Sequence, residues 1–267
     1  MQRPPHFHGQ DTGQPPGLTN PSLLWIMPSL WIHGAGLSGS TWAGFTRTLR
    51  KAVTPDLPGH GTASTVHPPR VTRYASELAS VMPEACVLVG HSLGGMVALE
   101  LAARHPERVK ALILIECVPT VRTGRLRLLA AQLAKGLMQS LPPSCLGWLS
   151  GLGQSAETAR HLKEQLSQND RSSISAALEA AIRYDGRRVL QQIKAPTLVI
   201  VGRKNRATHQ GARLIAEEIL DARLVVLPGG HMLHTDNPVQ LRREIDRFLN
   251  DVLGGVSAGF DHRPEPQ

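Results

Sequence analysis

An apolar segment that ends in a G-x-S-x-G turn and passes directly into an Ala- and Leu-rich stretch constrains this chain most. The turn is Gly90-His91-Ser92-Leu93-Gly94, and residues 86–89 before it are typical of a buried strand, whereas residues 93–104 are typical of a helix. Glycines two residues either side of Ser92 permit the strained backbone that carries a strand straight into a helix. The turn exposes the Ser92 hydroxyl and places the Leu93 N–H at a helix N-terminus, which favours an oxyanion. It is therefore predicted to supply a nucleophile and part of an anion site.

Strand-like and helix-like segments alternate along the chain and indicate an α/β fold. The apolar runs lie at residues 30–33, 51–54, 86–90, 111–116, 197–202 and 223–227, and helical stretches lie at about 40–50, 70–82, 93–105, 208–220 and 238–252. Such alternation predicts a doubly wound, mostly parallel sheet with helices on both faces. The chain has 267 residues, of which 41% are hydrophobic, and this suffices for one globular domain.

The alternation stops between Val118 and Ala195, where helical patterns take over. Because this insertion follows the strand that ends at Glu116, it is expected to form a helical cap over the C-terminal edge of the sheet. The predicted organisation is a disordered N-terminal extension at 1–22, a core at 23–118 and 195–253, a cap at 119–194 and a flexible tail at 254–267.

Two further segments have the composition of site loops. Residues 30–32 read as a buried strand that leads into His33-Gly34-Ala35-Gly36, where Ala35 is expected to supply a second N–H for an oxyanion. Residues 224–227 lead into Pro228-Gly229-Gly230-His231, which places a histidine on a loop just beyond a strand. The predicted base therefore follows the predicted nucleophile along the chain.

Across about residues 29–250 the chain resembles the α/β-hydrolase superfamily, specifically its small bacterial esterase and haloperoxidase-like branch. The resemblance lies in H-G-A-G, D-L-P-G-H-G, G-H-S-L-G-G and G-G-H-M-L-H, found in that order. It implies that Ser92 is the nucleophile, that His231 is the general base, and that the N–H groups of Ala35 and Leu93 form the oxyanion hole. It also separates the chain from haloalkane dehalogenases and epoxide hydrolases of this fold, which have an aspartate at the position of Ser92. The short N-terminal part implies an abbreviated sheet.

The acid of the triad departs from the family pattern. The usual G-x-x-D segment reads Gly202-Arg203-Lys204-Asn205 here, and Asn205 has no charge to stabilise an imidazolium. In serine proteases the Asp-to-Asn change at the triad costs about 10⁴ in kcat. Glu116 is the candidate replacement, because some members of the superfamily carry their acid at the end of this strand. The alternative is a rim carboxylate paired with an arginine.

Two other carboxylates are weaker candidates for the acid. Asp185 is assigned to the return segment of the cap, and Asp236 is expected to cap the helix that starts near Pro238. The cap itself is rich in leucine. Within it, Met138, Leu141 and Trp148 are expected to line an apolar cavity, which favours a hydrophobic acyl or alcohol group.

Composition narrows the class of partner. The net charge is +8, but the arginines are scattered and aromatic residues make up only 4%, so no specific nucleic-acid partner is expected. His6 and His8 lie in a Pro-rich stretch without further ligands, so neither a metal site nor a cofactor is expected. The partner is expected to be a small-molecule ester, and the sequence leaves the oligomeric state open.

Cysteine usage and hydropathy bear on the compartment. The chain has three dispersed cysteines, an odd number that argues against a disulfide framework and for a reducing compartment, so the expected location is the cytoplasm. The apolar stretch 23–32 is too short to span a bilayer and is interrupted by Pro28. We expect no transmembrane segment and interpret 23–32 as a core strand.

Together these features predict a serine carboxylesterase that forms an acyl-enzyme on Ser92 and transfers the acyl group to water. Thioesterase, lactonase, perhydrolase or acyltransferase chemistry uses the same residues. A different class is a weakly hydrolytic or non-hydrolytic small-molecule receptor of the same fold, which the uncharged Asn205 motivates.

Overall fold

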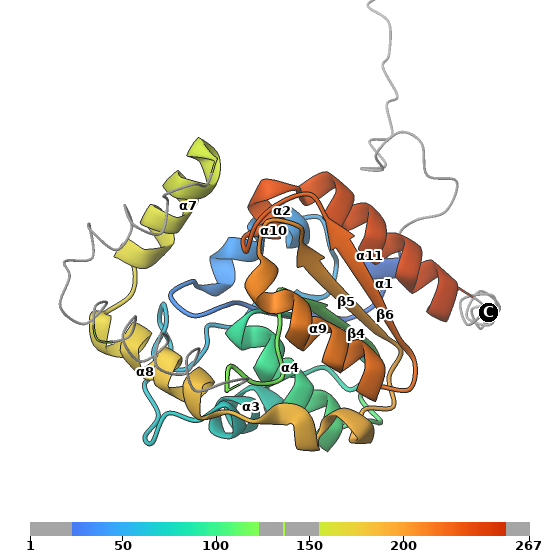
Figure 1. Ribbon diagram of the computed structural model, residues 1–267, viewed down its shortest axis with the longest axis horizontal. Helices are drawn as coiled ribbons and strands as arrows, with labels where there is room; N and C mark the ends of the chain where they lie inside the picture. The colour runs from blue at the N-terminus through green and yellow to red at the C-terminus, as the bar shows by residue number, and fades with distance from the viewer. Residues whose placement is uncertain (1–22, 123–135, 137–154, 255–267) are drawn as a thin grey trace, which may run out of the picture.

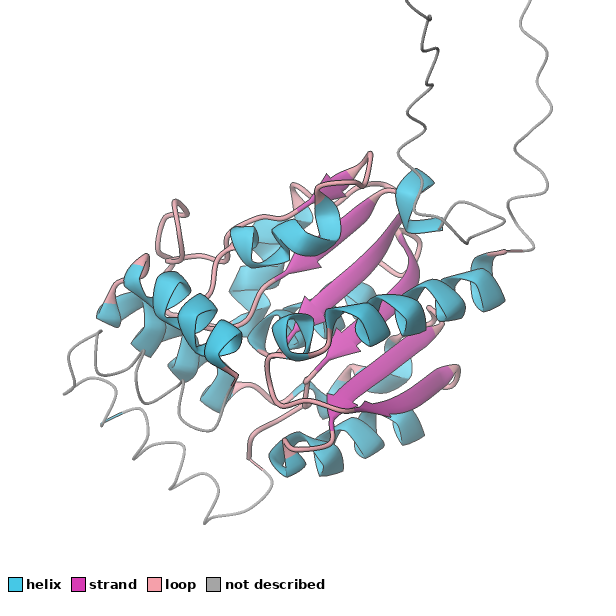
Figure 2. Ribbon diagram, turned by 90° about the horizontal axis from the view of Figure 1, so that it is seen from above, coloured by secondary structure: helices cyan, strands magenta, loops and turns pink. Residues whose placement is uncertain are grey.

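The computed structural model describes residues 23–122, 136 and 155–254. A six-stranded sheet forms its centre, between layers of helices (Figures 1 and 2). The strands are β1 (Ser29–Ile32), β2 (Ala52–Val53), β3 (Cys86–His91), β4 (Val109–Ile115), β5 (Thr197–Gly202) and β6 (Ala222–Leu227). They lie in the order β2-β1-β3-β4-β5-β6, and each neighbouring pair is parallel. The predicted α/β fold with a mostly parallel sheet is confirmed.

Helices lie between successive strands, before β1 and after β6. They are α1 (Leu23–Ile26), α2 (Ala43–Thr46), α3 (Val71–Ala79), α4 (Leu93–Arg104), α7 (Ala156–Ser167), α8 (Arg171–Arg183), α9 (Arg206–Glu218), α10 (Leu233–Asp236) and α11 (Pro238–Leu253). Short 3₁₀ segments lie at Gly39–Trp42, Gly186–Arg188 and Leu190–Gln192. None of these helices is long and apolar enough to cross a membrane, within the part of the chain described.

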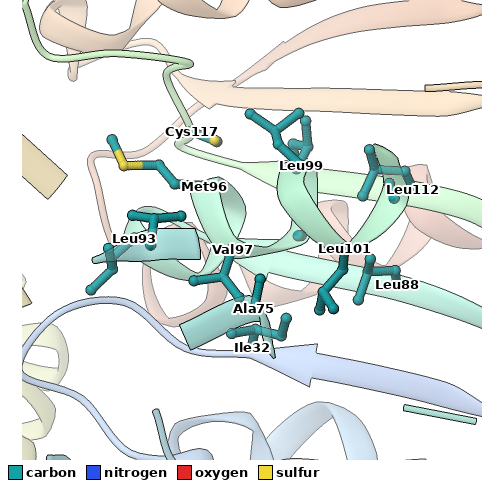
Figure 3. Packing of buried hydrophobic residues seen from close by; sticks show 14 of the residues in the cluster. Ile32, Ala75, Leu88, Leu93, Met96, Val97, Leu99, Leu101, Leu112 and Cys117 are labelled. Carbon is teal, nitrogen blue, oxygen red and sulfur yellow. The ribbon is translucent and has the colours of Figure 1, made fainter. Parts of the chain in front are cut away.

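Two hydrophobic cores lie on opposite faces of the sheet. Alternate residues of a strand point to opposite faces, so Leu88 and Leu112 pack with α3, α4 and α9, whereas Val87 and Ile113 pack with α1 and α11. Helix α4 is buried along almost its whole length. Figure 3 shows its Val97, Leu99 and Leu101 among the side chains of β1, β3 and β4.

The strand order determines where loops converge. β1 has β2 on one side and β3 on the other, so the connections that leave β1 and β3 diverge at this point of the sheet. Open α/β sheets hold their ligands at such a switch point, beyond the carboxyl ends of the strands. The loops that follow β1, β3, β4, β5 and β6 all emerge at this edge. Helices α7 and α8 lie on the same side, toward which the strand arrows point (Figures 1 and 2).

The first apolar stretch differs from the prediction. Residues 23–32 were expected to form one core strand, but Leu23–Ile26 form the short helix α1 and only Ser29–Ile32 form β1. Pro28 separates the two because it supplies no N–H to a helix or ladder. Leu23 and Leu24 pack in the core that includes α11 residues such as Leu249.

Several expectations concern residues outside those described. These are the N-terminal extension 1–22, nearly all of the tail 254–267 and the three proposed pocket residues Met138, Leu141 and Trp148. The predicted cap limits 119–194 stay a prediction. Within the described residues, Cys86 and Cys117 are buried free thiols.

Candidate active site

Ser92 occupies a sharp turn between β3 and α4. Its backbone has φ 54° and ψ −116°, a conformation that residues with a side chain rarely adopt. The Ser92 N–H donates to the carbonyl oxygen of Ile115 at 2.9 Å, which ties the turn to the end of β4. This hydrogen bond to the sheet helps to maintain the strained backbone conformation of Ser92.

Close packing explains the glycines of the turn. A Cβ on Gly90 would lie 2.5 Å from the Gly94 carbonyl oxygen, and one on Gly94 would overlap the carbonyl oxygens of Ile32 and His33. Contacts this short exclude any side chain at either position. The two ends of the turn therefore lie in close contact with each other, and the turn also lies in close contact with the loop that follows β1.

The loop after β1 passes directly over the turn. A Cβ on Gly34 would lie 2.8 Å from His91 Nδ1 and 3.3 Å from the Cβ of Ser92. Two residues further on, Gly36 has φ 75° and donates its N–H to His60 Nε2 at 3.1 Å. Across the described residues, the N–H groups of Ala35 and Leu93 have no hydrogen-bond acceptor. Both groups are consequently available to a bound oxyanion.

His231 lies on the loop between β6 and α10, and 41% of its side chain is exposed. Its carbonyl oxygen accepts a hydrogen bond from His91 Nε2 at 2.9 Å, and the two rings lie 4.9 Å apart. Because His91 immediately precedes Ser92, this contact keeps the His231 loop beside the turn. No hydrogen bond joins Ser92 to His231 in the described residues, and catalytic bonds of this kind often form only when substrate is bound.

Glu116 follows β4 and has φ 53°. Its side chain is fully buried, and its Oε2 lies 3.6 Å from His231 Nδ1. Oε1 accepts a hydrogen bond from the Gly202 N–H. Oε2 accepts from Asn205 Nδ2 at 2.6 Å and from Thr208 Oγ1 at 2.7 Å. These donors satisfy the carboxylate, and no arginine among the described residues pairs with it, which disfavours the alternative of an arginine-paired rim carboxylate.

Asn205 lies between the carboxylate and the imidazole. Its Nδ2 is 3.0 Å from His231 Nδ1 as well as 2.6 Å from Glu116 Oε2. The two candidate acid positions therefore meet at the same ring nitrogen, and only Glu116 has a charge. Thr208, which also contacts the carboxylate, was not anticipated. The only sequence signal for it is its position three residues after Asn205, in the first turn of α9.

The family model described as the alpha/beta hydrolase family matches residues 30–244. The chain belongs to the alpha/beta hydrolase family. A curated relative from Aeromonas hydrophila subsp. hydrophila, named a pimeloyl-[acyl-carrier protein] methyl ester esterase, is 28% identical over 82% of this chain and 93% of its own. A relative of the same name from Methylococcus capsulatus is 31% identical over 66% of this chain and 75% of its own. The structure of a thermophilic esterase from Thermogutta terrifontis has a TM-score of 0.72 at 22% identity, covering 85% of this chain and 90% of that one.

Buried histidines lie beside the loop that contains His231 in this alpha/beta hydrolase. Burial lowers the pKa of His91 well below its usual value, with His231 and His234 adding to the effect. Burial also lowers the pKa of His234 to about 3. His234 Nε2 bonds to Thr41 Oγ1 at 3.0 Å, and the centroid of its ring lies 5.0 Å from that of His91 in the turn.

The two weaker acid candidates of this alpha/beta hydrolase have other roles. Asp185 pairs with Arg187 at 2.5 Å. Asp236 was expected to cap the helix that begins at Pro238, but the residue at that N-cap is Asn237. Asp236 instead accepts hydrogen bonds from the Gly230 N–H and from Thr158 Oγ1, both at 2.7 Å. The loop after β6 and helix α7 thus both donate to its carboxylate.

Proposed function

We propose that this protein is a serine carboxylesterase that cleaves esters of small to medium hydrophobic acids or alcohols through an acyl-enzyme on Ser92. The observation that carries the proposal is the Ser92 turn, where a strained serine, two free N–H groups and a histidine loop meet. This is the arrangement that acyl transfer needs: a nucleophile, an oxyanion site and a base. Membership of the alpha/beta hydrolase family and the esterase names of the relatives support the same reaction class.

The proposed reaction has two halves. His231 Nε2 takes the proton of the Ser92 hydroxyl as the oxygen attacks the ester carbonyl, and the N–H groups of Ala35 and Leu93 stabilise the oxyanion. The alcohol leaves with the proton from His231. In the second half His231 removes a proton from water, which attacks the acyl-enzyme. His231 then returns this proton to the Ser92 oxygen as its bond to the acyl group breaks and the acid is released.

Glu116 is our proposed acid. When His231 takes the proton it becomes an imidazolium, and the buried carboxylate oxygen Glu116 Oε2, 3.6 Å from Nδ1, is close enough to stabilise that charge. Asn205 then holds the carboxylate by donating to Oε2. In the alternative, Asn205 itself holds the imidazole. Because Nε2 can take a proton only if Nδ1 carries the ring hydrogen, Asn205 must then turn its Oδ1 toward Nδ1 in place of the Nδ2 that lies 3.0 Å away. An amide orients the ring but adds no charge stabilisation.

Only a class of substrate is proposed. The names of the relatives concern a methyl ester of an acyl group on a carrier protein, which supports a carboxylic ester as the reacting bond. We propose a helical cap over residues 119–194 that contributes Met138, Leu141 and Trp148 to an apolar pocket, as the sequence indicates. A small-molecule ester is the proposed partner, and the cytoplasm the proposed location, in keeping with the free thiols Cys86 and Cys117.

The deciding experiment combines turnover and labelling. The purified chain is incubated with p-nitrophenyl esters of increasing acyl length, and separately with a fluorophosphonate probe that labels activated serines. We expect turnover of short and medium acyl esters and stoichiometric labelling. A chain that binds hydrophobic small molecules but shows neither turnover nor labelling would support the receptor of the same fold instead.

A further inference from the structure

Helix α7 carries a stripe of polar residues where a helix usually has apolar ones. Thr158, His161, Gln165 and, just past the helix end, Asn169 follow one another at spacings of three, four and four residues. Residues with this spacing share one face of a helix. Thr158, Gln165 and Asn169 are only 0%, 5% and 8% exposed. This polar stripe therefore faces the body of the protein, on the edge where the site loops emerge.

The second half of the polar stripe holds the loop that follows β1. Gln165 Oε1 accepts hydrogen bonds from the Ser38 N–H at 2.8 Å and from Ser38 Oγ at 3.0 Å. Asn169 Nδ2 donates to the Gly36 carbonyl oxygen at 3.2 Å, and its Oδ1 accepts from the Gly61 N–H at 3.0 Å. Ala35 immediately precedes Gly36. Asn169 and Gln165 thus anchor this loop one and three residues after Ala35.

The first half of the polar stripe holds the loop that contains His231. Thr158 Oγ1 donates to Asp236 Oδ1 at 2.7 Å, and Asp236 Oδ2 accepts from the Gly230 N–H at 2.7 Å. Gly230 immediately precedes His231. A second link runs from His161 Nε2 to Thr41 Oγ1 at 2.7 Å and on to His234 Nε2 at 3.0 Å. Both links end within three residues of the proposed base.

We propose that Thr158, Gln165 and Asn169 are positioning residues that hold the oxyanion loop and the base loop in register with Ser92. The inference rests on the proposed function and extends it to the cap. Neither loop belongs to a helix or strand, so side-chain hydrogen bonds act together with the close backbone contacts to set its position, and a misplacement of about 1 Å can cost about 10² in rate. Hydrogen bonds suit this task because they fix direction as well as distance. An apolar face on α7 would bury surface without aligning either loop.

The test replaces each positioning residue by an apolar one of similar size. The variants are Gln165→Met, Asn169→Leu and Thr158→Val, with Thr158→Ser as the conservative rescue. The control is Glu164→Gln, on the exposed side of the same helix. For each protein, kcat on a p-nitrophenyl ester is divided by the fraction of molecules that a fluorophosphonate labels, so that misfolded protein does not count. The affinity for a boronic acid, which adds to the serine as a tetrahedral adduct, reports the oxyanion site.

We expect kcat per labelled site to fall by about 10-fold to 10²-fold in the three variants, with KM changed less than about threefold. Boronic acid affinity falls most in Gln165→Met and Asn169→Leu. The acidic limb of the pH profile of kcat/KM moves in Thr158→Val and is restored in Thr158→Ser, because that residue acts through His231. Glu164→Gln behaves as wild type.

Two results would overturn the inference in distinguishable ways. If the wild type is active and the variants lose thermal stability but keep kcat per labelled site within about twofold, the polar stripe only stabilises the cap and the proposed function stands. If the wild type shows neither turnover nor labelling, the proposed function fails and this inference fails with it.

Discussion

At the scale of single residues, the Glu116 carboxylate dominates the electrostatics of the site. A buried charge is costly unless hydrogen bonds and an opposite charge compensate it. Gly202, Asn205 and Thr208 supply the hydrogen bonds, and among the described residues that contact the carboxylate only His231 can become positive. Proton transfer from Ser92 to His231 would create that positive charge. In the proposed mechanism the buried carboxylate stabilises this positive charge as it forms.

The first residue-scale prediction concerns Ser92. Ser92→Ala should lower kcat for p-nitrophenyl esters by at least about 10⁴ and abolish fluorophosphonate labelling, because no other hydroxyl occupies the turn. Circular dichroism and thermal unfolding should show an intact fold, since the hydroxyl has no hydrogen-bond partner among the described residues. Continued labelling of Ser92→Ala would show that another serine is the nucleophile.

The second residue-scale prediction decides between the two acid positions. If Glu116 stabilises the imidazolium, Glu116→Gln should lower kcat by up to about 10⁴. Asn205→Asp should then change kcat little. The new carboxyl group would contact Glu116 Oε2, and two carboxyl groups in contact hold one proton between them, so the negative charge near the imidazole would stay about the same. Steady-state kinetics of both variants would reveal the opposite case: Glu116→Gln nearly silent, and Asn205→Asp faster than wild type. A wild type without activity that gains turnover with Asn205→Asp would favour the receptor.

At the scale of elements, the site depends on close approach between loops from different strands. Gly202 ends β5, and a Cβ there would overlap the Gly230 carbonyl oxygen and lie 2.6 Å from that of Gly229 and 2.9 Å from Glu116 Oε1. Three segments that follow β4, β5 and β6 therefore meet at this one glycine. The distance between acid and base is determined by how closely these backbones pack.

A substitution at this junction should separate the loops. Gly202→Ala should destabilise the protein by about 1–3 kcal/mol, as overpacking does, and lower kcat because Glu116 and His231 are pushed apart. Gly44→Ala is the matched control: it lies in α2 with nothing within 4 Å of a Cβ, and should stabilise by up to about 1 kcal/mol. Urea unfolding and kinetics measure both effects. Equal stability and activity for Gly202→Ala would contradict this account.

At the scale of the whole molecule, buried histidines couple stability to pH. Burial lowers the pKa of five histidines among the described residues: His33, His60, His91, His161 and His234. For His33 the geometry gives the reason, since Nδ1–H donates to the Gly34 carbonyl oxygen and Nε2 accepts from the Leu57 N–H, both at 2.8 Å. If Nε2 were protonated, it could no longer accept the hydrogen bond from the Leu57 N–H. The folded state therefore requires the neutral form.

The resulting prediction is loss of stability in acid. The folded pKa values lie below the unfolded value of 6.5, so the unfolded chain binds protons first and stability falls as pH drops below 6.5. His33 and His234, with pKa values of about 3, should each account for a loss of about 2 kcal/mol between pH 6.5 and pH 5. Urea midpoints at pH 7.5, 6.5 and 5 measure this effect. His234→Gln should make the dependence shallower, and a flat profile in the wild type would contradict the prediction.

Local rules explain what the sequence by itself determined about this protein. The strand before Ser92, the glycine turn and the helix from Leu93 were predictable because each depends on neighbours within a few residues. The parallel α/β architecture followed from the alternation of such segments, and the family followed from four motifs in order. The sequence also indicated that Asn205 breaks the family pattern and that Glu116 ends a strand at the correct edge.

Only the tertiary structure decided how distant residues are paired. It placed Glu116, Asn205 and His231 within one set of contacts, although they lie on three different loops. It assigned Asp236 to Gly230 and Thr158 and made Leu23–Ile26 a helix, both against the prediction. The contacts of the polar stripe of α7 could not be predicted either, because spacing shows which residues share a helix face but not which residues that face contacts. The physical reason is that hydrogen-bond partners across a sheet edge depend on how loops from separate strands are packed, which no local period encodes.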